Sequence, residues 1–228
     1  MRENIVSAVK EAIEKSKDRK FLESVDLAIN LKDVDLSIPK NRINEEVILP
    51  HGRGKEIKVG VFASGETALK AKECADIVIP PEEIDKLAED KRKARKLANQ
   101  YDFFLAEVPL MARIGKTLGI ILGPRGKMPK PIPPGGDPCP MVRNLKKTVR
   151  MRSRDKRTFH VPVGTKNMEI EKIAENIEEV LKRLEHKLER GYQNIESVYV
   201  KTTMGLSLIH ISEPTRLLSI SYAVFCLK

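Results

Sequence analysis

The stretch "EIKVGVFASGETALKAKECADIVIP" (residues 56–80) decides the fold class of this chain. "EIKVGVFA" (56–63) and "DIVIP" (76–80) are short apolar runs typical of buried strands, and the segment between them begins like a capped helix. Residues 81–100 predict a second helix, "YDFFLAE" (101–107) a third strand, and residues 108–119 a third helix. Strands that alternate with helices through short connections lie parallel, so we predict a three-layer α/β unit.

The segments on either side of this unit predict a different sheet. A helix is expected at 3–17, strands at 21–31 and 42–50, a strand at 158–164, a long helix at 168–190 and a closing strand at 195–204. We expect the second strand to pair with the first, and Gly191 to cap the long helix. Residues 121–140 are rich in Gly and Pro and are expected to be mostly loop.

The predicted fold class is therefore α/β, with an α+β first domain built from both chain ends. Residues 1–53 and 156–205 form this first domain, and residues 54–155 form the inserted α/β domain. Residues 206–228 follow the closing strand as an atypical tail.

The charge of the chain indicates an acidic partner. Its 228 residues carry a net charge of +10, and "KRKARK" (91–96) and "RNLKKTVRMRSRDKR" (143–157) supply much of the positive excess. Nucleic acid is the first candidate for such a partner, and a solubilising surface is the alternative.

Signals for other functions are weak. The three cysteines are scattered, so neither a zinc site nor a disulfide framework is expected, and no histidine spacing suits a metal. "HGRGKE" (51–56), "GPRGKMPKP" (123–131) and "FASGET" (62–67) each have features of anion-binding loops, but GxGxxG and P-loop patterns are absent. We expect no cofactor, no catalysis, no signal peptide and no membrane span, and a reducing cytoplasm as the location.

Strand alternation sorts the side chains of the outer sheet into two faces. In the closing strand Val198, Val200 and Thr202 are expected to face the helices. The polar side chains of the three outer strands are expected on the opposite face, where they gather if the strands are neighbours. RNA presents phosphates and ribose 2′-hydroxyls that such a hydroxyl-rich surface can meet. The expected outward residues are Ser24, Asp26, Asn30, His160, Pro162, Ser197, Tyr199, Lys201 and Thr203.

Four motifs together resemble one family. "PHGRGKE", "LGPRGKMPKP", "PVGTKNM" and "SVYVKTTMG", in this order, closely resemble the L-one family of large-subunit ribosomal proteins, archaeal type, over about residues 1–205. The resemblance implies a first domain made from both chain ends with a Rossmann-like second domain inserted. It implies a non-enzymatic protein of the cytoplasmic ribosome that binds stalk ribosomal RNA, assists release of exit-site tRNA and represses its own messenger RNA. Free of the ribosome, it is expected to be a monomer.

The resemblance also implies an RNA-binding site in the first domain. Family contacts map onto Phe21, Ser24, Ser197, Thr203, Met204 and Gly205, with Lys20, His160, Gly164, Lys166 and Lys201 as adjacent candidates. Alternation places Phe21 on the core side of its strand, which leaves only its position at the strand start for RNA contact. A nucleotide-dependent enzyme built on the inserted domain, and a basic scaffold without specific recognition, remain alternatives.

The resemblance stops at Gly205. Family members continue with a proline and a short basic strand, whereas this chain reads "LSLIHISEPTRLLSISYAVFCLK" with three charged residues, Glu213, Arg216 and Lys228. We interpret residues 206–228 as foreign to the fold, from a frame change or vector sequence; a lineage-specific extension is the alternative.

Overall fold

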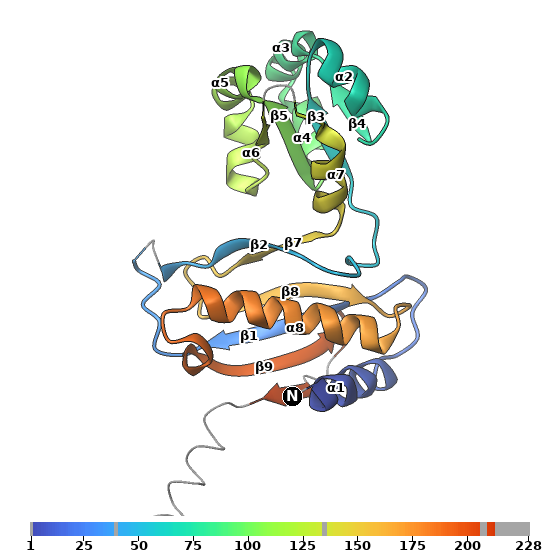
Figure 1. Cartoon of the computed structure of the whole chain (residues 1–228), viewed down its shortest axis with the longest axis vertical. Coiled ribbons are helices and arrows are strands. Elements are labelled where there is room, and N and C mark those ends of the chain that lie inside the picture. Colours follow the sequence, from blue (N-terminus) through green and yellow to red (C-terminus); the bar gives the residue numbers. More distant parts are fainter. Residues whose placement is uncertain (1, 39–40, 134–135, 206–208, 213–228) are drawn as a thin grey trace, which may run out of the picture. The chain divides into compact units, whose positions relative to one another are not determined.

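Two compact units make up the chain (Figure 1). The structure, a computed structural model, describes residues 2–38, 41–133, 136–205 and 209–212. Unit 1 combines residues 1–55 with 148–228, and unit 2 comprises residues 56–147. The second boundary falls at 147 rather than 155, because residues 148–152 form a strand that pairs within unit 1.

Unit 1 is an antiparallel sheet packed against helices. Strands β1, β8 and β9 are neighbours in the order β10-β9-β1-β8, and helices α1 and α8 pack against one face (Figure 1). The apolar stripe of α8 meets the alternating apolar residues of the strands, which explains why each strand buries every second residue. The elements are α1 (Arg2–Glu14), β1 (Ser24–Leu31), β2 (Asn44–Ile48), β7 (Thr148–Arg152), β8 (Thr158–Thr165), α8 (Ile170–Lys187), a 3₁₀ turn (Gly191–Asn194), β9 (Ile195–Thr202) and β10 (Ile209–Ser212).

Two details of unit 1 differ from the sequence predictions. The strand predicted at 42–50 does not pair with β1; as β2 it pairs with β7 in a separate two-stranded sheet, a partner hidden in the basic segment 143–157. Gly191 does not cap α8, which ends at Lys187 with Leu188 as its cap; Gly191, at φ +54°, begins the 3₁₀ turn instead.

Part of the tail also joins the sheet. Residues 209–212 form β10, which pairs with β9; the foreign origin of residues 206–228 stays a prediction. The edge of β9 offers unpaired N–H and C=O groups, and the alternating Ile209 and Ile211 bury their side chains in the core. Residues 206–208 and 213–228 lie outside the described residues.

Unit 2 has the predicted three-layer architecture. Its parallel sheet has the order β4-β3-β5-β6. One apolar cluster joins one face of the sheet to α2 and α7, and a second joins the other face to α3, α4, α5 and α6. The elements are β3 (Val59–Phe62), α2 (Gly65–Lys72), β4 (Ile77–Ile79), α3 (Pro81–Glu89), α4 (Lys91–Gln100), β5 (Phe103–Glu107), α5 (Val108–Thr117), α6 (Gly119–Arg125), β6 (Lys130–Ile132) and α7 (Pro138–Lys146).

Two predictions for unit 2 are refined by the structure. The helix predicted over 81–100 is two helices, because Asp90 leaves helical geometry and its carboxylate accepts hydrogen bonds from the N–H groups of Arg92 and Lys93. The segment 121–140, expected to be mostly loop, contains the end of α6, the strand β6 and the start of α7.

A disulfide joins Cys74, just after α2, to Cys139 in the first turn of α7. The expectation of no disulfide framework is wrong at this pair. The two cysteines are separated by 65 residues in the sequence, and only the packing of α2 beside α7 brings them together.

Candidate nucleic-acid interface

The face of the unit 1 sheet opposite α1 and α8, here called the open face, carries polar side chains in cross-strand rows. Antiparallel register places Asn30 between Thr158 and Ser197, Ala28 between His160 and Tyr199, and Asp26 between Pro162 and Lys201. The predicted inward and outward sides are correct along all three strands, since Phe159, Val161 and Val163 are buried as well. The sheet therefore gathers the predicted polar residues on one surface.

The side chains of the row Thr158, Asn30 and Ser197, at the end of the open face away from Thr203, hydrogen-bond to one another. The amide of Asn30 donates to the hydroxyl of Ser197 at 2.8 Å and accepts from the hydroxyl of Thr158 at 2.8 Å. Ser197 is consequently only 6% exposed. It lies on the predicted face, but its neighbour covers it, so it supports the surface more than it presents a free hydroxyl.

The two rows nearer to Thr203, which contain Ala28 and Asp26, carry the side chains that are more accessible to solvent. His160 is exposed, and Tyr199 and Lys201 are half-buried. Asp26 lies directly opposite Lys201 in the register, which moderates the positive charge at this point.

At the near end of the open face, β9 runs into a tight turn of Thr203, Met204 and Gly205, here called the 203–205 turn. The hydroxyl of Thr203 donates to Oδ2 of Asp26 at 2.7 Å and is 3.1 Å from the carbonyl oxygen of Ser24. The N–H of Thr203 donates to the same carbonyl at 2.9 Å. A hydroxyl has one hydrogen and two lone pairs, so Thr203 has only acceptor capacity left for a partner.

Gly205 closes this turn for a steric reason. Its N–H donates to the carbonyl oxygen of Thr202 at 2.9 Å. A Cβ at Gly205 would stand 2.4 Å from Oγ1 of Thr202, a buried threonine at the end of β9. Any larger residue must therefore displace the turn.

The 203–205 turn and the segment before β1 each carry an exposed apolar side chain. Met204 is 53% exposed and Phe21 is 56% exposed, and Lys20 beside Phe21 is exposed too. The prediction that Phe21 lies on the core side is wrong, because β1 begins only at Ser24 and the preceding residues do not follow its alternation. Large apolar groups held in water next to polar ones are typical of binding surfaces.

The end of β8 and the loop after it offer fewer groups for RNA contact than the sequence analysis predicts. Gly164 is buried, and a Cβ there would stand 3.0 Å from Cγ1 of Ile173, so its role is to let α8 approach the sheet. Lys166 reaches the surface, where its ammonium donates to Asp18 at 2.7 Å. This hydrogen bond and the charge of Lys166 lower the pKa of the Asp18 carboxyl.

In two other candidate anion-binding loops, the groups that could bind an anion already hydrogen-bond to other residues of the protein. The N–H and hydroxyl of Ser64, at the start of α2, donate to the carboxylate of Glu107 at 3.2 and 2.8 Å, so a side chain takes the place of an anion. The ammonium of Lys127 donates to the carbonyl oxygens of Ala98 and Tyr101. These contacts disfavour the nucleotide-enzyme alternative.

The loop 51–54 is fixed to α8. His51 lies 2.5 Å from Glu175, which the imidazole and Arg2 hold at a pKa below its usual range. The buried amide of Asn176 donates to the carbonyl oxygen of Gly52 at 2.8 Å. This loop therefore has a structural role in unit 1.

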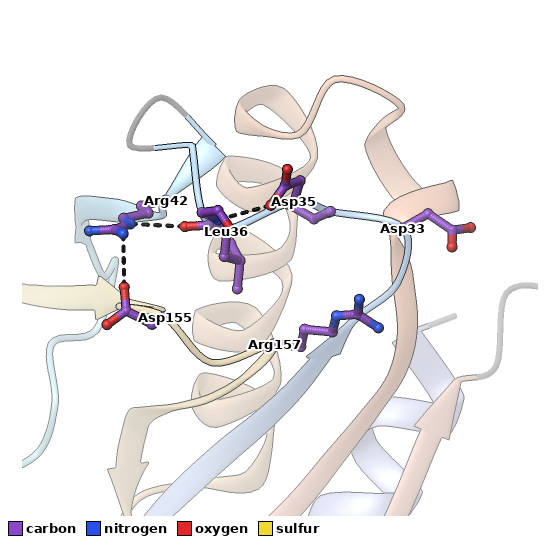
Figure 2. Close-up of a pocket in the computed structure, with 8 residues that line it drawn as sticks. Asp33, Asp35, Leu36, Arg42, Asp155 and Arg157 are labelled. Carbon is purple, nitrogen blue, oxygen red and sulfur yellow. Dashed lines mark hydrogen bonds and ion pairs between the residues drawn. The ribbon is translucent and has the colours of Figure 1, made fainter.

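A hollow of about 670 Å³ is lined by residues 33–37, which follow β1, together with Arg42, Asp155 and Arg157 (Figure 2). Arg42 donates to the carbonyl oxygen of Leu36 at 2.9 Å and pairs with Asp155 at 3.0 Å. Three aspartates line this hollow, so it suits a polyanion less well than the 203–205 turn does.

Two residues near the turn were missed by the sequence analysis, Arg19 and Glu23. Both contact Met204. No local signal marks Glu23, because an acidic residue just before an apolar strand gives no sign that it will be buried.

The described residues show no cluster that could hold a metal ion, and none of the described helices is long and apolar enough to cross a membrane.

Comparison with known proteins identifies the family. Residues 9–206 match the model of the Ribosomal protein L1p/L10e family. The chain is 60% identical over 202 residues to the large ribosomal subunit protein uL1 of Thermoplasma acidophilum, covering 89% of this chain and 93% of the relative. It is 57% identical over 205 residues to uL1 of Archaeoglobus fulgidus, covering 90% and 95%. The family match ends one residue past Gly205, where the motif resemblance ends. The chain belongs to the Ribosomal protein L1p/L10e family, whose uL1 members are non-enzymatic constituents of the large ribosomal subunit.

Proposed function

We propose that this chain is a constituent of the large ribosomal subunit that binds stalk ribosomal RNA through the open face and the 203–205 turn of unit 1. The observation that carries the proposal is the geometry of this turn, in a chain of this family. It combines a hydroxyl with free acceptor capacity, an exposed methionine and a glycine whose place a larger residue cannot take without displacing the turn.

The chemistry of RNA supports this surface. A ribose 2′-hydroxyl can donate to the oxygen of Thr203, which has already given its own hydrogen to the protein. Met204 and Phe21 offer exposed apolar contacts for sugars or bases. Lys20 and Lys201 lie close in sequence to these groups and supply positive charge for phosphates.

Two further roles extend the proposal. We further propose that the chain assists release of exit-site tRNA and represses its own messenger RNA, two roles that the motif resemblance implies. Repression requires the messenger to present the same shape as the ribosomal site. The free protein is proposed to be a monomer, which leaves the open face available.

A competition experiment tests the proposal. Labelled stalk RNA bound to the purified protein is challenged with the chain's own messenger segment, with deacylated tRNA and with an unrelated duplex of equal length. Displacement by the messenger at concentrations where the duplex has no effect supports a shared specific site. Equal displacement by both would contradict specific recognition.

A further inference from the structure

A buried acid and a neighbouring base, Glu23 and Arg19, hold the main chain of Met204 from both sides. The carboxylate of Glu23 accepts a hydrogen bond from the N–H of Met204 at 2.8 Å. The guanidinium of Arg19 donates to the carbonyl oxygen of Met204 at 3.2 Å, and its Nε is 3.8 Å from the same carboxylate oxygen. Together the two side chains satisfy both polar groups of the central residue of the turn.

The burial of Glu23 calls for a reason. Its side chain is 3% exposed, whereas glutamate rarely leaves water without a partner because its charge is costly to desolvate. The carbonyl oxygen of Glu23 also accepts from the N–H of Lys166 at 3.0 Å. Glu23 therefore ties together the segment before β1, the loop after β8 and the 203–205 turn, which are far apart in the sequence.

We propose that Glu23 and Arg19 are positioning residues that pre-organise the 203–205 turn for RNA, an inference that rests on the proposed function. They act through Met204, since Glu23 is buried beneath the turn and has no surface to offer a ligand. A turn that is ordered before binding spares the complex the entropy cost of ordering it. Arg19 also offsets the negative charge that Glu23 would otherwise direct at RNA phosphates.

The test compares Glu23→Ala, Glu23→Gln and Arg19→Gln. Glu23→Ala is expected to weaken stalk RNA binding about tenfold, and Glu23→Gln about threefold, because glutamine keeps an oxygen for the Met204 N–H but loses the charge. Arg19→Gln removes a largely surface contact and leaves the Glu23 bond in place, so it remains informative if the Glu23 variants fold poorly. Glu189→Gln, an exposed acid beyond the end of α8, is the control for the change in charge.

Hydrogen exchange at the Met204 amide, followed by NMR in the RNA-free protein, supplies a readout specific to the turn. Faster exchange at Met204 in parallel with weaker binding, without a matching fall in melting temperature, supports the proposal. Unchanged RNA affinity in folded Glu23→Gln and Arg19→Gln would overturn it. If instead the unmodified protein binds stalk RNA no better than an unrelated duplex, the proposed function fails, and the exchange data alone decide whether the two residues order the turn.

Discussion

Replacing Thr203 with valine removes one hydroxyl and keeps the shape of the side chain. In the free protein the hydroxyl donates to Asp26 at 2.7 Å, and its lone pairs are open to a donor from RNA. The variant loses that RNA contact and leaves the half-buried Asp26 carboxylate short of a donor. The missing donor to Asp26 costs the free and the bound protein alike, so affinity for stalk RNA falls through the lost RNA contact alone, by about 1–3 kcal/mol or roughly 5- to 150-fold.

The assay is equilibrium binding of a stalk RNA fragment, together with versions carrying single 2′-deoxy substitutions. Thr203→Ser should bind nearly as well as the unmodified protein because it keeps the hydroxyl. Thr117→Val is the matched control, since it removes a hydroxyl in unit 2 that donates to the carbonyl oxygen of Arg113 at 2.8 Å. It should leave RNA affinity nearly unchanged.

A double-mutant cycle identifies the partner of Thr203. One 2′-deoxy position should weaken binding to the unmodified protein but have little further effect on Thr203→Val, since both changes remove the same hydrogen bond. Strictly additive losses at every position, or equal losses for Thr203→Ser and Thr203→Val, would refute the role assigned to the hydroxyl.

Three further predictions address the turn, a surface pair and the disulfide. Gly205→Ala should weaken RNA binding at least about tenfold, because its Cβ collides with a buried hydroxyl at 2.4 Å, whereas Gly119→Ala, where a Cβ meets no atom within 4 Å, should not. Asp18→Asn should tighten binding about two- to fivefold by releasing Lys166 for phosphate; weaker binding would argue against this competition. The hydrogen bond from Lys166 lowers the pKa of the Asp18 carboxyl. The stabilisation from this pair is therefore fully present above the ordinary carboxyl pKa and is lost as pH falls through the lowered value. The binding assay for Asp18→Asn is accordingly run at neutral pH. Cys74→Ser should destabilise unit 2 by about 4 kcal/mol and abolish any effect of reductant on its melting temperature; two free thiols in the purified oxidised protein would contradict this.

Periodicity predicted the fold class and the two faces of the outer sheet, but not the two-stranded sheet of β2 and β7. Alternation in β1, β8 and β9 gave the correct inner and outer sides, because one face of the sheet is buried and the period of a strand leaves no ambiguity. The apolar runs of unit 2 indicated a parallel sheet because both of its faces are covered by helices.

The details of the site depend on contacts that alternation does not encode. Ser197 is on the predicted face but is covered by Asn30, a neighbour across the sheet. Gly164 allows α8 to pack closely against the sheet. Glu23 accepts a hydrogen bond from Met204, which is 181 positions away in the sequence. Such pairings arise from tertiary structure, so local pattern predicts which side chains share a face of the sheet but not which of their atoms remain free.

The most direct test of the central claim is the affinity for a stalk RNA fragment and for an unrelated duplex of equal length, measured over a salt series. Phosphate contacts alone would give both RNAs the same affinity and the same salt slope. Recognition by the open face and the 203–205 turn predicts similar slopes with a large preference for the stalk fragment that persists at high salt. Equal affinities that fall together as salt rises would contradict specific recognition.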